Sequence, residues 1–287
     1  MTESPNVRIA LVGRAENVVL VRDVLGGLGD GIDLGGTVED IKAAVSEAVN
    51  NVVVHAYGGG EGPMEVEVTI DSGTLEVVVR DHGVGIGPRM VDDAHPGRGI
   101  GLAVIEALAA SCELRAHGES SVEVVMRFDV PAQPVLAGLD GEGLVSRIDD
   151  GDVFEIAIAP ASLSPPVFDR VVTGLAARAG FSIDRLSDVQ LVTDALTARI
   201  VPALAGDQVR LGVVARRRGV ELRLAPLRAG GSDTLIADCA IAELGPVIEA
   251  LADEVVMRQE ADGEVLALVF RDSRTSAGPS AAAPDAR

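Results

Sequence analysis

The feature that most constrains the fold of this chain is an order of sequence elements that occurs twice. The hexapeptide VIEALA at Val104–Ala109 is repeated identically at Val247–Ala252, and a β-rich run closes each block. These hexapeptides are 143 residues apart, and earlier in the blocks an offset of 147 residues places Val24 on Val171, which is consistent with small loop deletions. VIEALA is a common helical sequence, so a chance recurrence is the alternative. The collinear order of the matches favours a duplication.

Each block is predicted to contain a strand, two helices, two strands, a helix and a strand. The two strands around Asp71-Ser72-Gly73 form a clear hairpin, because EVEVTI and TLEVVV alternate in polarity on either side of a short turn. Hairpin-linked strands with separate helices predict an α+β fold. We expect two tandem α/β-sandwich domains, each a mostly antiparallel mixed sheet with helices on one face. The elements predicted in the first block are residues 7–12, 17–28, 38–56, 64–71, 74–80, 99–110 and 122–129.

Composition shifts set the predicted boundaries of the two domains. The first domain covers residues 6–130, and a Pro- and Gly-containing linker follows at 131–151. The second domain covers residues 152–271. The remaining residues, 272–287, are rich in Ala, Ser and Pro, so we predict a disordered tail.

Charge and composition exclude several classes of function. The formal net charge of −20 repels phosphate backbones and anionic lipid, so we expect no direct binding to nucleic acid or membrane. No apolar run has the length of a membrane span, and the N-terminus does not resemble a signal peptide. These features predict a cytoplasmic protein. Cys112 and Cys239 have no metal-ligand or disulfide spacing and are interpreted as small buried residues.

Three polar segments carry the candidate chemistry, and the first lies on a predicted helix, SEAVNNVVVHAY. Glu47, Asn51 and His55 recur at every fourth position, so they share one helical face. A solvated surface would give the same spacing.

The second segment, Arg80–Gly87, follows a predicted strand and has the sequence RDHGVGIG. Gly83 and Gly85 let the backbone approach a flat ligand, while Asp81 accepts a hydrogen bond from it. A Gly-rich turn with an exposed acid is the alternative interpretation.

The third segment, Gly97–Leu102, has the sequence GRGIGL and opens an apolar helix. Unpaired amides at such a helix N-terminus suit phosphate oxygens. The segment lacks the Gly-Lys-Ser/Thr of a P-loop, and it does not follow a strand as a Rossmann loop does.

In this order and spacing, the three segments resemble the N, G1 and G2 boxes of the GHKL (Bergerat-fold) ATPases. SEAVNNVVVHAY, DHGVGI and GRGIGL are most similar to those of the anti-sigma-factor serine kinases, which regulate sporulation and stress responses in bacteria. The resemblance covers most of residues 7–129. It implies that the protein binds ATP and Mg²⁺ in this block.

The resemblance also implies a role for each matching residue. Asn51 would coordinate Mg²⁺, and Asp81 would accept the adenine amino group. Ser121 or Ser120 would take the place of the family's threonine beside the adenine, and His55 matches a family histidine that we interpret as structural. The glycines that would make room for the ring are Gly83 and Gly85.

The phosphates and the reaction involve a second group of matching residues. Gly97, Gly99 and Gly101 would bring backbone amides to the phosphates, with Arg98 adding charge. Glu47 would be the general base that orients or deprotonates the attacking hydroxyl.

A short segment between Gly85 and Gly97, and the lack of a phosphoacceptor helix ahead of the first strand, favour the stand-alone kinase branch. The expected activity is transfer of the ATP γ-phosphate to a Ser or Thr of a partner protein such as an anti-sigma-factor antagonist. A sigma factor is the other expected partner. The alternatives are a non-catalytic, ATP-dependent switch that regulates transcription, and a slow ATP hydrolase without a protein substrate.

The second block departs from the family pattern. Asp194 and Ala198 stand where the first block has its acid and its amide. Pro226 or a neighbour replaces the aspartate of the second segment, and Ala240 and Ala242 fall where loop glycines are expected. We therefore predict a degenerate GHKL-like domain that pairs with the first as an intramolecular pseudo-dimer.

Overall fold

The computed structural model describes residues 4–57, 60–82, 99–117, 121–140, 152–241 and 245–272. Within these ranges no helix is long and apolar enough to span a bilayer. The elements of the first half are β1 Val7–Val12, the 3₁₀ turn Ala15–Asn17, α1 Val18–Gly31, the 3₁₀ turn Gly35–Thr37, α2 Val38–Asn51, the π-helix Val52–Ala56, β2 Pro63–Asp71, β3 Thr74–Asp81, α3 Gly99–Leu108, β4 Ser111–His117 and β5 Ser121–Asp129.

The second half repeats this order with short additions. Its elements are β6 Asp152–Ile158, the 3₁₀ turn Ala161–Leu163, α4 Ser164–Arg178, α5 Ile183–Arg199, the 3₁₀ turn Val201–Ala203, β7 Val209–Arg216, β8 Gly219–Leu227, α6 Gly231–Asp238, β9 Ala240–Ile241, β10 Gly245–Pro246, α7 Val247–Leu251, β11 Glu254–Glu260 and β12 Gly263–Arg271. Strands β9 and β10 pair only with each other.

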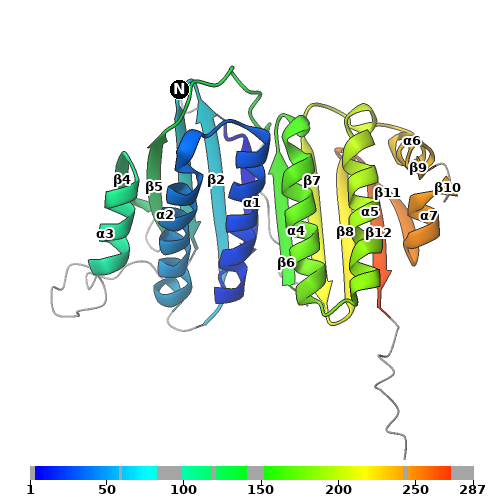
Figure 1. The fold of residues 1–287 in the computed structure, drawn as a ribbon, viewed down its shortest axis with the longest axis horizontal. Coiled ribbons are helices and arrows are strands. Elements are labelled where there is room, and N and C mark those ends of the chain that lie inside the picture. The colour runs from blue at the N-terminus through cyan, green and yellow to red at the C-terminus, as the bar shows by residue number, and fades with distance from the viewer. Residues whose placement is uncertain are drawn as a thin grey trace, which may run out of the picture.

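All the other strands form one continuous sheet (Figure 1). Its order is β11-β12-β8-β7-β6-β1-β2-β3-β5-β4, which reads outward from the centre in the same sequence on both sides. The halves join where β1 pairs with β6 in antiparallel register, with Ile9 opposite Ile156. The sheet therefore has a local two-fold arrangement about its central strand pair.

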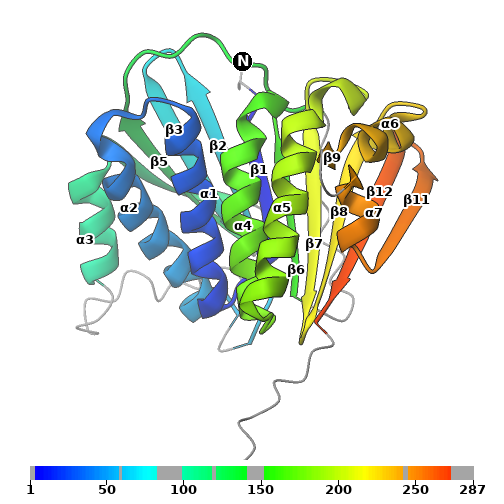
Figure 2. The same ribbon diagram turned by 45° about the vertical axis from the view of Figure 1, so that its right-hand side comes forward.

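The helices cover one face of this sheet. Figures 1 and 2 show α1, α2, α4 and α5 side by side over that face. Strands alternate accordingly: in β2 and β3 every second side chain is buried against the helices, and the others lie on the open face. The buried core contains few aromatic side chains and is built mainly from Val, Leu, Ile and Ala.

The structure confirms the hairpin around Asp71-Ser72-Gly73 and the predicted α+β class with helices on one face. Two expectations are corrected. Every pairing among the described strands is antiparallel rather than mixed, because β4 and β11 each return as hairpin partners of the following strand. In addition, the two sheets that were predicted form one continuous sheet, because β6 of the second half pairs with β1 at the edge of the first half.

Candidate functional site

The acid–amide face of the first predicted segment lies on the last turns of α2. Glu47 and Asn51 are both partly buried on this helix. Immediately after Asn51 the helix widens into a π-helix, Val52–Ala56, where His55 is exposed. Such π segments are rare in proteins, but where they occur they often lie at functional sites.

The start of α3 lies against these two side chains. A Cβ atom placed on Gly101 would lie 3.1 Å from Oε2 of Glu47 and 3.5 Å from both Oδ1 and Nδ2 of Asn51. The absence of a side chain at Gly101 thus leaves a small space bounded by a carboxylate, an amide and the first turn of a helix. A magnesium-bound phosphate requires oxygen ligands for the metal and amide donors for the phosphate oxygens, and a carboxylate and an amide beside the first turn of a helix fit such a group.

Asp81 is the last residue of β3, and its side chain is buried on the helix-covered side of the sheet. The hydroxyl of Ser121, at the start of β5, donates a hydrogen bond to the main-chain carbonyl of Asp81. This bond holds the ends of the two strands together. The structure therefore places the predicted adenine acceptor beside Ser121, and leaves Ser120 outside the described residues.

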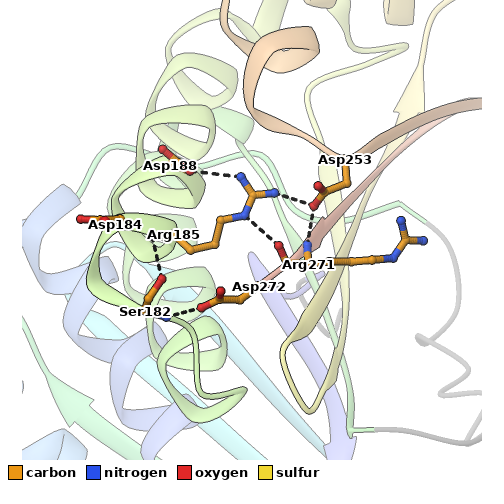
Figure 3. Close-up of a pocket in the computed structure, with 7 residues that line it drawn as sticks. All are labelled: Ser182, Asp184, Arg185, Asp188, Asp253, Arg271 and Asp272. Atoms are coloured by element: carbon orange, nitrogen blue, oxygen red, sulfur yellow. Dashed lines mark hydrogen bonds and ion pairs between the residues drawn. The ribbon is translucent and has the colours of Figure 1, made fainter. Parts of the chain in front are cut away.

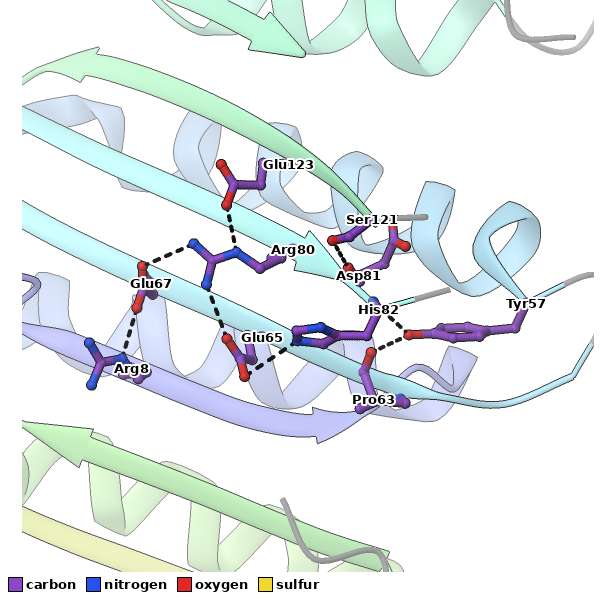
Figure 4. A network of polar contacts seen from close by, with 10 residues as sticks. All are labelled: Arg8, Tyr57, Pro63, Glu65, Glu67, Arg80, Asp81, His82, Ser121 and Glu123. Atoms are coloured by element: carbon purple, nitrogen blue, oxygen red, sulfur yellow. Dashed lines mark hydrogen bonds and ion pairs between the residues drawn. The ribbon is translucent and has the colours of Figure 1, made fainter. Parts of the chain in front are cut away.

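Tyr57 links the end of the acid–amide helix to the strand that carries Asp81. Its hydroxyl accepts a hydrogen bond from the amide of His82 at 3.0 Å and donates one to the carbonyl of Pro63 (Figure 4). A Cβ on Gly62 would lie 2.1 Å from the tyrosine ring, so only glycine fits there. Burial, and the nearby charge of Asp81, raise the pKa of Tyr57, whereas the hydrogen bond from His82 lowers it.

Tyr57 was not among the site residues predicted from the sequence. It is the only tyrosine in a chain that is poor in aromatic residues, and it follows the polar helix directly. That isolation was the available signal. Its contacts with the first residue of β2 and with the residue after β3 are visible only in the structure.

A network of charged side chains lies on the open face of the sheet, behind Asp81 (Figure 4). Arg80 donates to Glu123 at 2.6 Å and to Glu65 at 3.1 Å, and it lies 3.7 Å from Glu67. Burial lowers the pKa of Arg80, but these three carboxylates raise it overall. The network ties β2, β3 and β5 together and keeps the end of β3 in place.

Four of the predicted site residues fall outside the described part of the chain. They are Gly83, Gly85, Gly97 and Arg98. Gly99 is the first residue of α3, two residues ahead of the contacts made at Gly101.

The corresponding positions of the second half are arranged differently. Asp194 and Ala198 both lie exposed on α5. The helix α6 has no described counterpart in the first half, and both its Leu235 and the following Cys239 are buried. Glu264 accepts hydrogen bonds from two amides at the start of α6, and these bonds lower its pKa. These amides are therefore occupied by the chain's own carboxylate.

A polar hollow of about 160 Å³ lies at the N-terminal end of α5 (Figure 3). Arg185 lies at its centre and donates to Asp188 at 3.1 Å, to Asp253 at 2.5 Å and to the carbonyls of Leu251 and Arg271. Its guanidinium is therefore already paired with the fold's own acceptors. We interpret this hollow as a structural lock between α5 and the β11–β12 edge.

Comparison with known proteins shows which family the chain resembles. Residues 12–128 match the family model described as histidine kinase-like ATPase domain. The serine-protein kinase RsbW of Listeria monocytogenes is 36% identical over 139 residues, which are 44% of this chain and 87% of that protein. RsbW of Bacillus thuringiensis is 25% identical over 141 residues, 45% of this chain and 88% of that protein. The anti-sigma F factor of Clostridium kluyveri is 30% identical over 96 residues, 31% of this chain and 68% of that protein.

The family match lies in the first half, which holds the α2 face, the start of α3 and the buried aspartate of β3. The second half lies outside the family match. On the strength of these relatives and of the three motifs, the chain belongs to the GHKL ATPases, in the branch of the anti-sigma-factor serine kinases.

Proposed function

We propose that the first half binds Mg-ATP and transfers the γ-phosphate to a Ser or Thr of a regulatory partner protein. One observation supports this most strongly: the start of α3 faces Glu47 and Asn51 at the same time, with only the missing side chain of Gly101 between them. A binding site for a triphosphate needs helix amides, a metal ligand and a base within a few ångströms of one another.

Each residue has a defined task in this proposal. Asn51 would hold a magnesium ion, which supplies charge neutralisation to the phosphates. The amides from Gly97 to Gly101, with Arg98, would bind the phosphate oxygens. Glu47 would orient the incoming hydroxyl and accept its proton.

The adenine would bind at the other end of this site. The carboxylate of Asp81 would accept the adenine amino group, with Ser121 beside it and Gly83 and Gly85 making room for the ring. Tyr57 would position this end of the site relative to Asn51, because it joins the end of the π-helix to the residue after Asp81.

A non-catalytic switch is the second candidate function. The nucleotide would then only set the affinity for a partner such as a sigma factor or its antagonist. This alternative uses the same nucleotide contacts and differs in giving Glu47 no catalytic role.

For the second half, we propose the role of a degenerate, built-in subunit. Its strands continue the sheet in the same order as those of the first half, and β6 occupies the edge of β1. Its matching helix carries Ala198 in place of the metal-binding amide, and α6 and Glu264 occupy the region that follows β8. It would support the first half without binding ATP.

Calorimetry of the full chain with Mg-ATP, followed by mapping of phosphorylated residues on proteins recovered with it, tests the proposal. Asn51→Ala is expected to abolish nucleotide binding. Glu47→Gln, which keeps the size of the side chain, is expected to retain binding and abolish transfer. If Glu47→Gln leaves phosphate transfer unchanged, Glu47 is not the base. If binding persists while no phosphate is transferred by the wild type, the switch is the correct function.

A further inference from the structure

The halves meet around a local two-fold axis that passes through one strand pair. Ile9 of β1 is opposite Ile156 of β6, and these two residues are 147 positions apart in the chain. The residues on either side of this pair are matched symmetrically about it. The same offset relates Gly27 of α1 to Gly174 of α4. For each contact between the two halves, this offset therefore identifies the residue that a second copy of the first half would place at the same position.

The helices α1 and α4 approach closely at these glycines. A Cβ on Gly27 would lie 2.6 Å from the Cα atom of Val167, and one on Gly174 would lie 3.3 Å from Oδ2 of Asp23. The two helix backbones are therefore close together at this seam, and charged side chains on α1 and α4 lie near one another along it.

These charges differ in sign between the two helices. The first half contributes Glu16, Asp23 and Asp30, which recur at every seventh residue and lie along one stripe. The second half contributes Arg170, which donates to Asp30 at 2.7 Å, and Arg178, which donates to the carbonyl of Glu16 at 3.3 Å. These cross-seam contacts join acidic groups of the first half to basic groups of the second, although Arg22 of α1 and Lys42 of α2 also lie near Asp23.

The local symmetry shows which charges would meet if a second copy of the first half replaced the second half. Arg170 stands at the position that the 147-residue offset relates to Asp23. In such a pair, the half-buried Asp23 would meet the same carboxylate of the other copy, with Asp30 beside it. Burial raises the pKa of Asp23, and Arg170 is the cation that opposes this most. Replacing that cation by another carboxylate removes the largest of the compensating charges, leaves Lys42 and Arg22, and adds repulsion.

We infer that the α1–α4 seam is a charge-coded interface that pairs the first half with the second half of the same chain and rejects a second copy of the first half. Ion pairs at such a partly exposed rim stabilise a fold only slightly, whereas like charges brought together select against a wrong partner. This inference rests on the proposed role of the second half as a built-in subunit.

Arg170→Asp in the full chain tests it, because this variant reproduces within one molecule the contact that two first halves would make. Arg170→Asn is the matched control, since it removes the attraction without adding a charge. Hydrogen exchange at the amides between β1 and β6 is the measurement, with the amides between β7 and β8 as an internal reference. We expect exchange in the Asp variant to be about tenfold faster than in the Asn variant, a difference of roughly 1.4 kcal/mol. The reference amides should exchange alike in both.

Rescue by removing the opposing carboxylates distinguishes charge from packing. Asp23→Asn combined with Asp30→Asn should slow exchange in the Arg170→Asp chain more than it does in the wild type. Equal exchange in the Asp and Asn variants, or a rescue no larger than its effect on the wild type, overturns the inference. So does a wild-type dimer joined through α1 in sedimentation experiments. All these measurements are made without nucleotide, so failure of the proposed kinase activity leaves them interpretable.

Discussion

Gly101→Ala should separate nucleotide binding from stability. The affinity for Mg-ATP is expected to fall, whereas the free energy of unfolding is expected to stay the same or rise slightly. The added methyl group would enter the space between the start of α3 and the acid–amide face of α2. It would lie 3.5 Å from Oδ1 of Asn51. A magnesium ion on that oxygen would be only about 2.1 Å from it and would need its remaining octahedral positions for phosphate and water. The methyl group therefore occupies space that the bound phosphates require.

The size of each effect can be worked out from the same contacts. Loss of one well-placed ionic contact costs about 1.5–3 kcal/mol, so the dissociation constant for Mg-ATP should rise about ten- to hundred-fold. Alanine in a helix is up to about 1 kcal/mol more favourable than glycine. The methyl group lies 3.1 Å from Oε2 of Glu47, but that carboxylate ends a flexible side chain and can shift by a few tenths of an ångström. The free energy of unfolding should therefore stay the same or rise slightly.

Calorimetry with Mg-ATP and urea unfolding of the same preparation measure both quantities. Gly36→Ala is the matched control, because a Cβ there would meet nothing within 4 Å. It should leave the dissociation constant unchanged and the free energy of unfolding within about 0.5 kcal/mol of the wild type. Wild-type affinity in Gly101→Ala would refute the placement of the phosphates between α2 and α3. A loss of stability that accompanies the loss of binding would refute the steric reasoning.

Three further outcomes are expected. Tyr57→Phe, which removes two hydrogen bonds and keeps the ring, should weaken Mg-ATP binding about fivefold without unfolding the protein, as calorimetry and circular dichroism would show. Gly27→Ala should destabilise the chain by about 2 kcal/mol in urea, because overpacking against the backbone of Val167 exceeds the helical gain, whereas Gly31→Ala, with its nearest neighbour at 3.6 Å, should not. Burial raises the pKa of Cys239 to about 11, so its reaction with a disulfide reagent should be slow at pH 8 and accelerate as the pH rises toward 11. The reaction should become fast when the protein unfolds. Rapid labelling of the native protein at pH 8 would contradict this.

Local patterns in the sequence were sufficient for the parts of the fold that depend on neighbours in the chain. The alternation on either side of Asp71-Ser72-Gly73 specified a hairpin, because side-chain direction in a strand has a period of two. The run that carries Glu47 and Asn51 was predicted as one helix, residues 38–56, and it is an α-helix continued by a π-helix. Strand β4 was missed, since it is an edge strand whose side chains are largely exposed and do not alternate clearly.

Other features depended on contacts between distant residues, which only the tertiary structure could decide. The sequence presented Gly101 and Asn51 as members of separate motifs, and the packing of α3 on α2 brings them together. It also indicated two similar blocks, but the pairing of β1 with β6 makes one sheet of them. Both depend on how elements dock on each other, and docking is determined by the shape and charge of whole surfaces rather than by the period of any one segment.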